Sequence, residues 1–287
     1  MKYLIAGANG QLASEFISQF GRAGTAFLAP SEQEFDITSP VSIKAVVEAY
    51  RPDVILNCAA YNLVDKAQTE SAKAFLVNAE GPRNLAMAAR QAGAKFVHYS
   101  SDYVFSGTKT TGAYLETDPT GPVNIYGESK LQGEKLVLAE YPQALILRLS
   151  WVYGCGSQNF IYKLQQWSKN PGSLKIADDE ISVPTSTERV ADLTLKAIVC
   201  GITGLYHGVS SGYCSRFEWA KAILNIVGIE KELEPAKTES FNLPAKRPAF
   251  SAMGNHCLAD ALGVDIPGWK KDLEGFILQK TGICHES

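Results

Sequence analysis

The stretch KYLIAGANGQLA (residues 2–13) places a glycine-rich turn directly after a short apolar run. The apolar run predicts a strand, and a helix is predicted to begin near Gln11. Gly7 would let the chain turn sharply, Gly10 would let the backbone approach a pyrophosphate, and Ala13 would keep the helix close to the strand. The free N–H groups at the start of such a helix favour bound phosphates. The stretch therefore predicts a dinucleotide-binding turn at the start of a βα unit.

The spacing of this turn is G-x-x-G-x-x-A, which differs from the commonest dinucleotide fingerprint, G-x-G-x-x-G. A tight βα turn also needs glycine for purely structural reasons. The position of the turn, between a predicted strand and a predicted helix, favours cofactor binding over a structural turn alone.

Short apolar runs alternate with amphipathic stretches through the first half of the chain. Strands are expected at residues 2–6, 25–29, 54–57, 95–100 and 144–149. Helices are expected from near Gln11, from Pro40 with Ser39 as N-cap, over residues 71–92 before Gly93, and over residues 126–140 before Pro142. This alternation, with nearly continuous apolar strands, predicts a doubly wound α/β fold of Rossmann type, with a parallel sheet covered on both faces.

The pattern of apolar runs changes after Trp151, where prolines divide the chain into shorter elements. Helices are expected near residues 188–200 and 216–227. We therefore expect residues 1–150 to form a dinucleotide-binding domain. Residues 151–287 are expected to form mainly a smaller substrate-binding lobe, interleaved with the first domain.

The composition is that of an ordinary globular protein. Of 287 residues, 46% are hydrophobic and 20% are charged, which argues against disorder. The net charge of −3 gives no electrostatic reason to expect nucleic acid or an anionic membrane as a partner. No apolar stretch approaches the roughly 20 residues needed to span a bilayer, and the apolar start is too short for a signal segment.

The cysteines are scattered and form no Cys-x-x-Cys pair. They are Cys58, Cys155, Cys200, Cys214, Cys257 and Cys284. Because the four histidines are also isolated, no structural metal is expected. Unpaired thiols in a chain of this size are typical of a reducing compartment, so we expect a cytoplasmic protein.

The choice between NADPH and NADH is not evident from the residues after the second predicted strand. Residues 30–33 (PSEQ) contain neither an Asp to bind both ribose hydroxyls nor an Arg or Lys to bind a 2′-phosphate. Asp36 and Ile37 could flank the adenine, although Asp36 could equally cap a turn. Either cofactor is therefore expected.

Tyr126 and Lys130 are four residues apart at the start of a predicted helix, so they share one face. A nearby ammonium would lower the pKa of the phenol toward working pH, and the phenol could then give a proton to a carbonyl oxygen. Lys130 could also bind the nicotinamide ribose, and Ser101 could hold the carbonyl oxygen from the other side. One Tyr-x-x-x-Lys is expected by chance in a chain this size, but the order glycine turn, Ser101, Tyr126, Lys130 favours the catalytic interpretation.

Several longer segments carry a resemblance to a known family. They are GANGQL (7–12), RPDVILN (51–57), AAY (59–61), VDKA (64–67), HYSSDYVF (98–105), YGESK (126–130), SWVYG (150–154) and Arg247-Pro248. On these segments the chain resembles the extended short-chain dehydrogenases/reductases and, among them, the dTDP-4-dehydrorhamnose reductase family. The resemblance implies reduction of the C4 ketone of dTDP-4-dehydro-L-rhamnose to dTDP-L-rhamnose by NADPH or NADH, with a nucleotide sugar as substrate.

The residue pattern and the resemblance together define the candidate site. The catalytic candidates are Ser101, Tyr126 and Lys130. The cofactor-binding candidates are Gly7, Asn9, Gly10, Gln11, Leu12, Asp36, Ile37, Ala59, Ala60, Tyr61, Tyr126 and Lys130. The substrate-binding candidates are Asn62, Val64, Asp102, Tyr103, Trp151 and Arg247. Trp151 and Val64 could instead be core residues, and Asp102 could be a turn former.

This sequence departs from the family pattern mainly on the substrate side. Ser101 stands where the family usually has Thr, and Ser182 stands where it usually has Gly; Glu180 adds a charge. Two alternatives therefore stay open: a reductase of another nucleotide-linked 4-keto-6-deoxy sugar, and a non-catalytic NAD(P)-binding regulatory subunit. A homodimer is possible, and Glu15 and Glu188 could lie at a subunit contact, hold a divalent ion, or simply face solvent.

Overall fold

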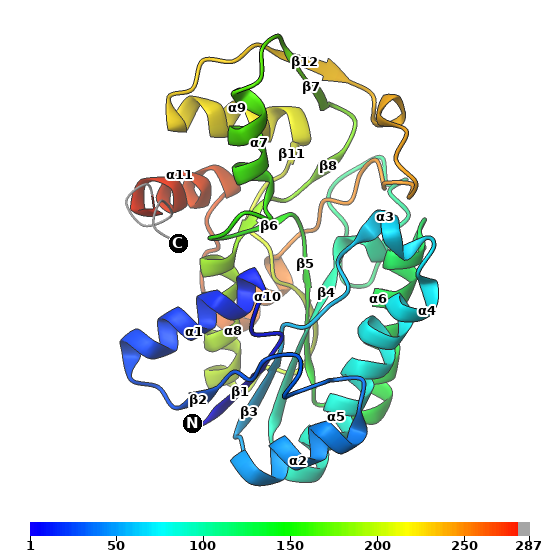
Figure 1. Ribbon diagram of the computed structural model, residues 1–287, viewed down its shortest axis with the longest axis vertical. Coiled ribbons are helices and arrows are strands. Elements are labelled where there is room, and N and C mark those ends of the chain that lie inside the picture. The colour runs from blue at the N-terminus through cyan, green and yellow to red at the C-terminus, as the bar shows by residue number, and fades with distance from the viewer. Residues whose placement is uncertain (281–287) are drawn as a thin grey trace.

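The computed structural model describes residues 1–280, and within them a six-stranded parallel sheet forms the centre of the molecule. Its strand order is β10-β5-β4-β3-β1-β2 (Figure 1). The strands are β1 Tyr3–Ala6, β2 Phe27–Leu28, β3 Val54–Asn57, β4 Lys95–Ser101, β5 Leu145–Leu149 and β10 Gly204–His207. The five strands expected in the first half and the doubly wound fold class are confirmed. The edge strand β10 comes from the second half of the chain.

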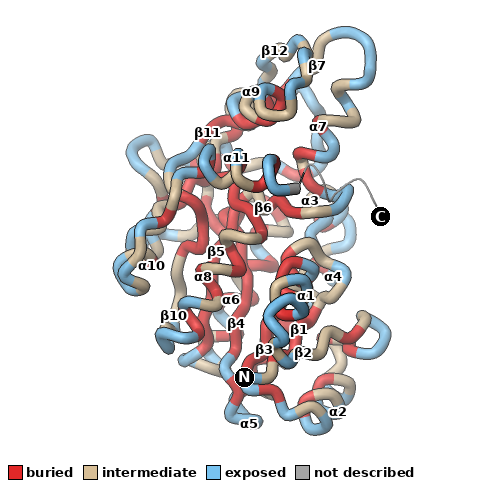
Figure 2. The backbone as a smooth tube through the Cα atoms, turned by 90° about the vertical axis from the view of Figure 1, so that its left-hand side faces the viewer, coloured by how far each residue is buried: buried red, intermediate tan, exposed pale blue. Residues whose placement is uncertain are grey.

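Successive strand residues face opposite sides of the sheet, so each strand contributes to two cores. Tyr3 and Ile5 pack with α1 (Gln11–Ala23), α8 (Thr187–Cys200) and α10 (His256–Leu262). Leu4 and Ala6 pack with α2 (Pro40–Tyr50), α5 (Gly81–Ala92) and α6 (Ile125–Glu140) on the other face. Figure 1 shows the two helix layers on opposite sides of the sheet. The tube view shows the strands between them as mostly buried and the outer turns as exposed (Figure 2).

The helix expected over residues 71–92 is divided into three parts. A π-helical turn, Leu76–Glu80, lies between α4 (Ser71–Phe75) and α5. Pro82 has no N–H and cannot complete the hydrogen bond to the carbonyl of Asn78. The turn directs the Asn78 side chain to Tyr61, where Asn78 Oδ1 accepts from the Tyr61 N–H (2.8 Å) and Nδ2 donates to the Tyr61 carbonyl (3.0 Å). The π turn therefore fixes the segment after β3.

Several short strands and helices of the second half form a group above the sheet in Figure 1. It contains α7 (Phe160–Ser168), α9 (Arg216–Val227), α11 (Trp269–Lys280) and the parallel pair β7 (Leu174–Ala177) and β12 (Leu233–Ala236). Two further pairs are β6 (Val152–Tyr153) with β9 (Thr185–Ser186), and β8 (Ile181–Ser182) with β11 (Cys214–Ser215). Helices near residues 188–200 and 216–227 were expected and are present.

A separate apolar core holds this group together around Trp219 and Tyr153. Within residues 1–280 no helix is long and apolar enough to cross a membrane. Cys58, Cys200, Cys214 and Cys257 have free thiols, while Cys284 lies outside the described residues.

Candidate active site

A cavity of about 310 Å³ lies at the carboxyl ends of the sheet strands, where ligands bind in doubly wound folds. It brings together eleven of the residues predicted from the sequence: Gly10, Gln11, Leu12, Ala59, Ala60, Asn62, Ser101, Asp102, Tyr126, Lys130 and Trp151. Eight predicted residues are not part of its lining: Gly7, Asn9, Asp36, Ile37, Tyr61, Val64, Tyr103 and Arg247. The three catalytic candidates therefore share one cavity with the glycine turn.

The glycine turn is shaped for close approach of a ligand backbone. Gly7 has a φ of 79°, and a Cβ there would lie 2.6 Å from the Ala59 nitrogen, so only glycine fits. The Gly10 N–H donates to the Gly7 carbonyl at 2.9 Å. In the described chain no side chain caps the N-terminus of α1 and its first turn carries no acidic residue. These open N–H groups suit a dinucleotide diphosphate at this point.

Asp36 and Ile37 are used within the protein fold. Asp36 Oδ1 accepts hydrogen bonds from the N–H (2.8 Å) and hydroxyl (2.7 Å) of Thr38, which is the turn-capping alternative. Ile37 is buried against Gly81, where a Cβ would lie 2.8 Å from Ile37 Cδ1. Their contact with adenine stays a prediction.

Helix α6 carries Tyr126 and Lys130, and its N-terminus is firmly anchored. Asn124 Oδ1 accepts from the Gly127 N–H (2.8 Å) as N-cap, and Asn124 Nδ2 donates to the Lys246 carbonyl (2.7 Å). A Cβ at Gly127 would lie 2.2 Å from the Tyr103 carbonyl oxygen, so the helix start lies directly against the segment after β4. These contacts set the height of the Tyr126 phenol above the end of the sheet.

Lys130 is buried, and its Nζ donates to the carbonyl of Tyr99 at 2.6 Å. Burial lowers the pKa of Lys130 to about 8, and the nearby Glu134 carboxylate opposes this shift. The Lys130 charge also acts on His98, whose pKa is lowered mainly by burial. The hydrogen bond to the Tyr99 carbonyl therefore positions Lys130 at the end of β4.

The expectation that Lys130 lowers the pKa of Tyr126 is wrong for this structure. Burial raises the pKa of Tyr126 to about 12, and the hydrogen bond with Ser101 only partly offsets that rise. The charge of Lys130 is not among the causes of this pKa shift, and the Lys130 ammonium is hydrogen-bonded to the Tyr99 carbonyl. The Tyr126 hydroxyl also lies 3.4 Å from Asn62 Oδ1. Tyr126 therefore keeps its proton at neutral pH.

Ser101 and Asp102 follow β4 directly. Ser101 Oγ accepts from the Tyr103 N–H (3.2 Å) and donates to Asp102 Oδ1 (3.2 Å). Asp102 is buried, and burial raises the pKa of its carboxyl while serine hydroxyls oppose that rise. The Tyr103 ring meets the Tyr126 ring edge-on at 5.6 Å.

Trp151 forms the opposite side of the cavity and is held in an unusual backbone conformation. Its φ is 41°, a value that costs an L-residue energy and that the surroundings must enforce. The indole stacks on Trp219 (5.5 Å between ring centroids), and the Arg216 guanidinium lies 3.7 Å from its centroid. Arg216 also pairs with Glu180 at 3.5 Å. This set extends the site toward the second half of the chain.

Arg247 contacts the short helix that begins with Val64. The guanidinium of Arg247 makes two hydrogen bonds to the Asp65 carboxylate, at 2.9 and 2.8 Å. Asp65 belongs to α3 (Val64–Ala67). The pair connects the loop around residue 247 to the segment after β3.

Some residues around the site were missed by sequence reasoning. The cavity lining also includes Asn57, and the surrounding shell includes Ser182, Arg216 and Ser251. Asn57 ends an otherwise apolar buried strand, and that position is a signal that could have identified it. The other three come from distant segments; no local pattern marks Arg216 and Ser251, and Ser182 is marked in the sequence only as a departure from the family pattern.

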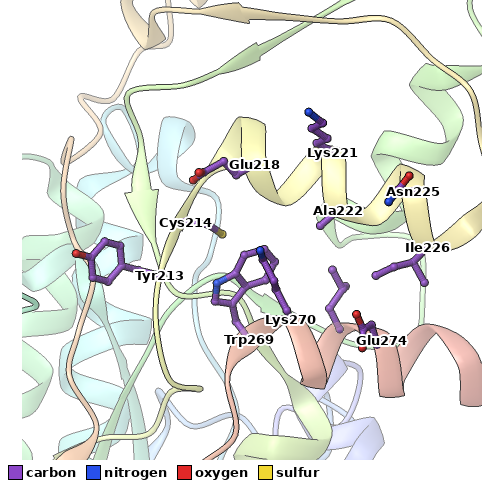
Figure 3. Close-up of a pocket in the computed structure, with 11 residues that line it drawn as sticks. Tyr213, Cys214, Glu218, Lys221, Ala222, Asn225, Ile226, Trp269, Lys270 and Glu274 are labelled. Atoms are coloured by element: carbon purple, nitrogen blue, oxygen red, sulfur yellow. The ribbon is translucent and has the colours of Figure 1, made fainter.

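Two further cavities lie outside this site. One of about 570 Å³ lies between α9 and α11, with Cys214 and Trp269 in its wall (Figure 3). Another of about 480 Å³ is lined by Glu15 and Glu188 among others. In the part of the chain that the structure describes, no group of three or more His, Cys, Asp or Glu side chains could hold a metal ion. Neither cavity contains the tyrosine–lysine pair.

The parallel sheet, the glycine turn and the Ser101–Tyr126–Lys130 group on one cavity define the class of the protein, the extended short-chain dehydrogenases/reductases. The family model of the RmlD substrate binding domain matches residues 1–281. The chain therefore belongs to the RmlD family.

Individual relatives match along nearly the whole chain. The spore coat polysaccharide biosynthesis protein SpsK of Bacillus subtilis is 34% identical, with 99% of each chain covered. A dTDP-4-dehydrorhamnose reductase of Burkholderia thailandensis is 36% identical over 94% of this chain and 96% of that protein. The crystal structure of dTDP-4-dehydrorhamnose reductase of Bacillus anthracis in complex with NADP has a TM-score of 0.93 at 33% identity, covering 97% of this chain and 99% of that one.

Proposed function

We propose that this protein is an oxidoreductase that reduces the C4 ketone of dTDP-4-dehydro-L-rhamnose to dTDP-L-rhamnose with NADPH or NADH. The observation that carries the proposal is the meeting of Ser101, Tyr126 and Lys130 with the glycine turn in one cavity. The named activity of the Burkholderia relative and the NADP of the Bacillus anthracis relative support the same reaction and cofactor class.

In this proposal the bound nicotinamide supplies the hydride. Tyr126, whose pKa of about 12 keeps it protonated, donates the proton to the carbonyl oxygen. Ser101 holds that oxygen, and Lys130 holds the cofactor ribose from its fixed place on the Tyr99 carbonyl. Exclusion of water by the walls of the cavity strengthens each of these polar contacts.

The remaining candidates take binding roles. The cofactor would be bound by the backbone of Gly7, Asn9, Gly10, Gln11 and Leu12, with Asp36, Ile37, Ala59, Ala60 and Tyr61 along its length. The sugar would be bound by Asn62, Val64, Asp102, Tyr103, Trp151 and Arg247. Residues 1–150 would then serve mainly the cofactor, and residues 151–287 mainly the substrate.

A nucleotide-sugar substrate and a diffusible nicotinamide cofactor favour a cytoplasmic enzyme. A homodimer remains a prediction for this chain. The proposed chemistry requires no second subunit, because all three catalytic candidates come from one chain.

A second candidate is reduction of another nucleotide-linked 4-keto-6-deoxy sugar. It is favoured by Ser182 and Glu180, which depart from the family pattern and lie beside the site. Ser182 Oγ donates to Asp102 (2.8 Å), and Glu180 pairs with Arg216 above Trp151. A non-catalytic subunit is disfavoured because Tyr126 and Lys130 are both present and both line the cavity.

The deciding experiment follows the absorbance of reduced nicotinamide. Purified protein is mixed with NADPH or NADH and with enzymatically generated dTDP-4-dehydro-L-rhamnose, and Tyr126→Phe is the matched inactive control. Rapid oxidation that is lost in the variant supports the proposed reaction and reveals the preferred cofactor. Oxidation only with a different 4-keto-6-deoxy sugar would select the second candidate. No oxidation with any such substrate, despite cofactor binding, would contradict both.

A further inference from the structure

Arg216 occupies a position at which a positive charge is electrostatically unfavourable. It is the first residue of α9 and follows the N-cap Ser215 directly. The N-terminus of a helix carries a partial positive charge, so a cation there destabilises the helix unless nearby groups offset it. The contacts of the Arg216 guanidinium show which groups do so.

Three aromatic rings and one carboxylate lie close to the Arg216 guanidinium. Its central carbon lies 3.7 Å from the ring centroid of Trp151, 5.1 Å from that of Phe160 and 5.6 Å from that of Trp219. The Glu180 carboxylate pairs with Nη2 at 3.5 Å. A tryptophan face is the best partner for a cation, and the contact with Trp151 is the shortest of the three. The main cation–π contact of Arg216 is therefore with Trp151.

Glu180 holds Arg216 by its backbone as well as by its side chain. The Arg216 N–H donates to the Glu180 carbonyl at 3.0 Å. The Glu180 carboxylate also accepts from the Thr238 hydroxyl at 3.3 Å, which helps to fix its orientation. Only 20% of the Arg216 side chain and 12% of the Glu180 side chain are exposed, so water and salt screen this pair less than a surface pair. The guanidinium is therefore held in one place.

Trp151 connects this arrangement to the proposed active site. It lines the cavity that contains the three catalytic candidates, whereas Arg216 and Glu180 are not part of the lining. The Trp151 carbonyl accepts from the Thr185 N–H at 3.4 Å, and its φ of 41° has to be enforced by contacts of this kind. Of the three side chains, that of Trp151 is the one placed to contact a ligand in the cavity.

The stack of Trp151 on Trp219 does not replace the contact with Arg216. The two ring centroids are 5.5 Å apart and the ring planes differ by 16°, which is the geometry of an offset stack. Trp219 is itself buried and stacks on Phe160 at 4.8 Å. Trp219 therefore sets the plane of the Trp151 indole, and a cation over the ring centre defines the position of the indole within that plane more sharply.

We propose that Arg216 and Glu180 are positioning residues for Trp151, and that they hold its indole in the orientation in which it contacts the sugar of the substrate. This inference rests on the proposed function, which gives Trp151 its substrate-binding role. The guanidinium lies against the indole and restricts its rotation, and Glu180 restricts the movement of the guanidinium. An indole that is already ordered loses less freedom when the sugar binds, so the sugar binds more tightly.

The pair adds shape to the cavity wall without adding net charge. Glu180 is a position at which this chain departs from the family pattern by a charge. Arg216 supplies the opposite charge directly beside it, so the formal charges of the two side chains cancel. The effect on the substrate should therefore come from the placement of Trp151 and not from an electric field acting on the sugar.

Steady-state kinetics of Arg216→Met with dTDP-4-dehydro-L-rhamnose test the inference. Methionine keeps an unbranched apolar chain and removes the guanidinium. KM for the sugar should rise about tenfold, because one partly buried cation–π contact contributes on that scale. The value of kcat should change less than about twofold, and the dissociation constant of the reduced cofactor should stay the same. Wild-type KM in Arg216→Met would overturn the inference.

Two further variants control this measurement. Arg216→Lys keeps the charge but not the planar group, so it should recover part of the loss. Lys270→Met removes a cation that lies 5.5 Å from the ring centroid of Trp269, outside the proposed active site. This matched control should leave KM unchanged. A tenfold rise in Lys270→Met as well would show a general effect of losing a cation near an indole, and it would overturn the specific role of Arg216.

A double-mutant cycle with Trp151→Leu separates positioning from direct contact between Arg216 and the substrate. If Arg216 acts through the indole, Arg216→Met should raise KM in the wild-type background and not in Trp151→Leu. An equal rise in both backgrounds would overturn the positioning role. Glu180→Gln should raise KM by less than Arg216→Met does, because the ring contacts of the guanidinium remain. An unchanged KM in Glu180→Gln would overturn the part assigned to Glu180.

Near-ultraviolet circular dichroism tests the positioning without turnover. The stacked indoles of Trp151 and Trp219 should give a coupled signal, which its loss in Trp151→Leu identifies. The signal should weaken in Arg216→Met and keep its intensity in Lys270→Met, while the far-ultraviolet spectra of all variants match wild type. A wild-type signal in Arg216→Met would overturn the positioning role. A weakened signal together with no oxidation of cofactor by the wild type would contradict the proposed function alone.

Discussion

Tyr126 and Lys130 lie one helical turn apart, and burial favours the neutral form of both side chains. For the phenol this means a pKa raised to about 12, and for the amine a pKa lowered to about 8. A raised pKa keeps the proton on Tyr126, which a proton donor needs before the reaction. The lowered pKa of Lys130 makes its charge sensitive to pH in a range where most lysines stay protonated.

Replacement of Tyr126 tests the proposed proton donor. Tyr126→Phe removes the hydroxyl and keeps the ring that meets Tyr103 edge-on. We expect kcat to fall by about 10²–10⁴-fold, because general acid catalysis contributes on that scale. The cofactor dissociation constant, measured by fluorescence of the reduced nicotinamide, should change little. Turnover equal to that of wild type would exclude Tyr126 as the acid.

The buried Lys130 makes the stability of the protein depend on pH. Its pKa is about 8 in the folded protein against 10.5 in its ordinary state. Between these values the unfolded chain binds a proton that the folded chain has released, so the free energy of unfolding contributed by this group rises with pH. The increase is roughly 3 kcal/mol across that window.

Urea unfolding of Lys130→Met at pH 7 and pH 10 measures this contribution. Lys130→Met should be more stable than wild type, and this difference should be larger at pH 7 than at pH 10. The reason is that the variant has no ammonium charge to bury. Lys135→Met, at an exposed position on the same helix, is the control and should show no such dependence. If the stability difference between wild type and Lys130→Met were equal at pH 7 and pH 10, the lowered pKa of Lys130 would be contradicted.

Helix α6 is the element on which the chemistry depends, since it presents both Tyr126 and Lys130. Its start is tied to the loop before residue 247 by Asn124, whose amide donates to the Lys246 carbonyl. Its body lies against the π turn, where a Cβ at Gly133 would be 2.1 Å from the Asn78 carbonyl oxygen. The helix is therefore held at its start by the Asn124 hydrogen bond and along its body by close packing at Gly133, where no larger residue fits.

Loss of the Asn124 cap should affect stability and activity together. Asn124→Ala removes the acceptor for the Gly127 N–H and the donor to Lys246. We expect the free energy of unfolding to fall by about 1–2 kcal/mol and kcat/KM to fall with it, because the first turn carries Tyr126. Ser39→Ala removes the matched cap of α2 and should cost about 1 kcal/mol with kcat/KM unchanged. Similar activity losses in both variants would contradict a specific role of the α6 cap.

At the scale of the whole molecule, the site is formed where the sheet meets the elements of the second half. The glycine turn and α6 come from the first half, whereas Ser182, Arg216 and Ser251 come from the second. Stability and ligand binding should therefore be linked, because a dinucleotide can bind only the folded chain.

Thermal unfolding with and without NADPH or NADH tests this linkage. At a cofactor concentration of about 100 times Kd the folded state should gain about 2.7 kcal/mol, which raises Tm by several degrees. Gly10→Val keeps an ordinary φ of −82°, but its Cβ would lie 3.3 Å from the Gly7 carbonyl oxygen, a tight contact that requires a small shift of the turn, so circular dichroism must first show that the variant folds. Its branched side chain should block the diphosphate and abolish the Tm shift. A full shift in Gly10→Val would place the cofactor elsewhere.

The amount that sequence reasoning could predict differs between elements. Strands β1 and β3 and helix α9 were predicted within a residue at each end, since apolar runs and turn residues lie next to one another in the chain. The continuous helix over residues 71–92 was predicted in place, but the π turn within it was not. Pro82 marks a break in the hydrogen bonding of that helix, but the packing of α6 against Asn78, which stabilises the π turn, is not evident from the local sequence.

The sequence by itself determined the parallel sheet, the glycine turn and the meeting of Ser101 with Tyr126 and Lys130. These follow from the periods of strands and helices and from the rule that strand ends meet at one edge. Only the tertiary structure decided that Tyr126 has a raised pKa and that Asp102 is held by Ser182 and Ser251. The physical reason is that burial and hydrogen bonding depend on groups far apart in the chain, and packing alone brings those groups into contact.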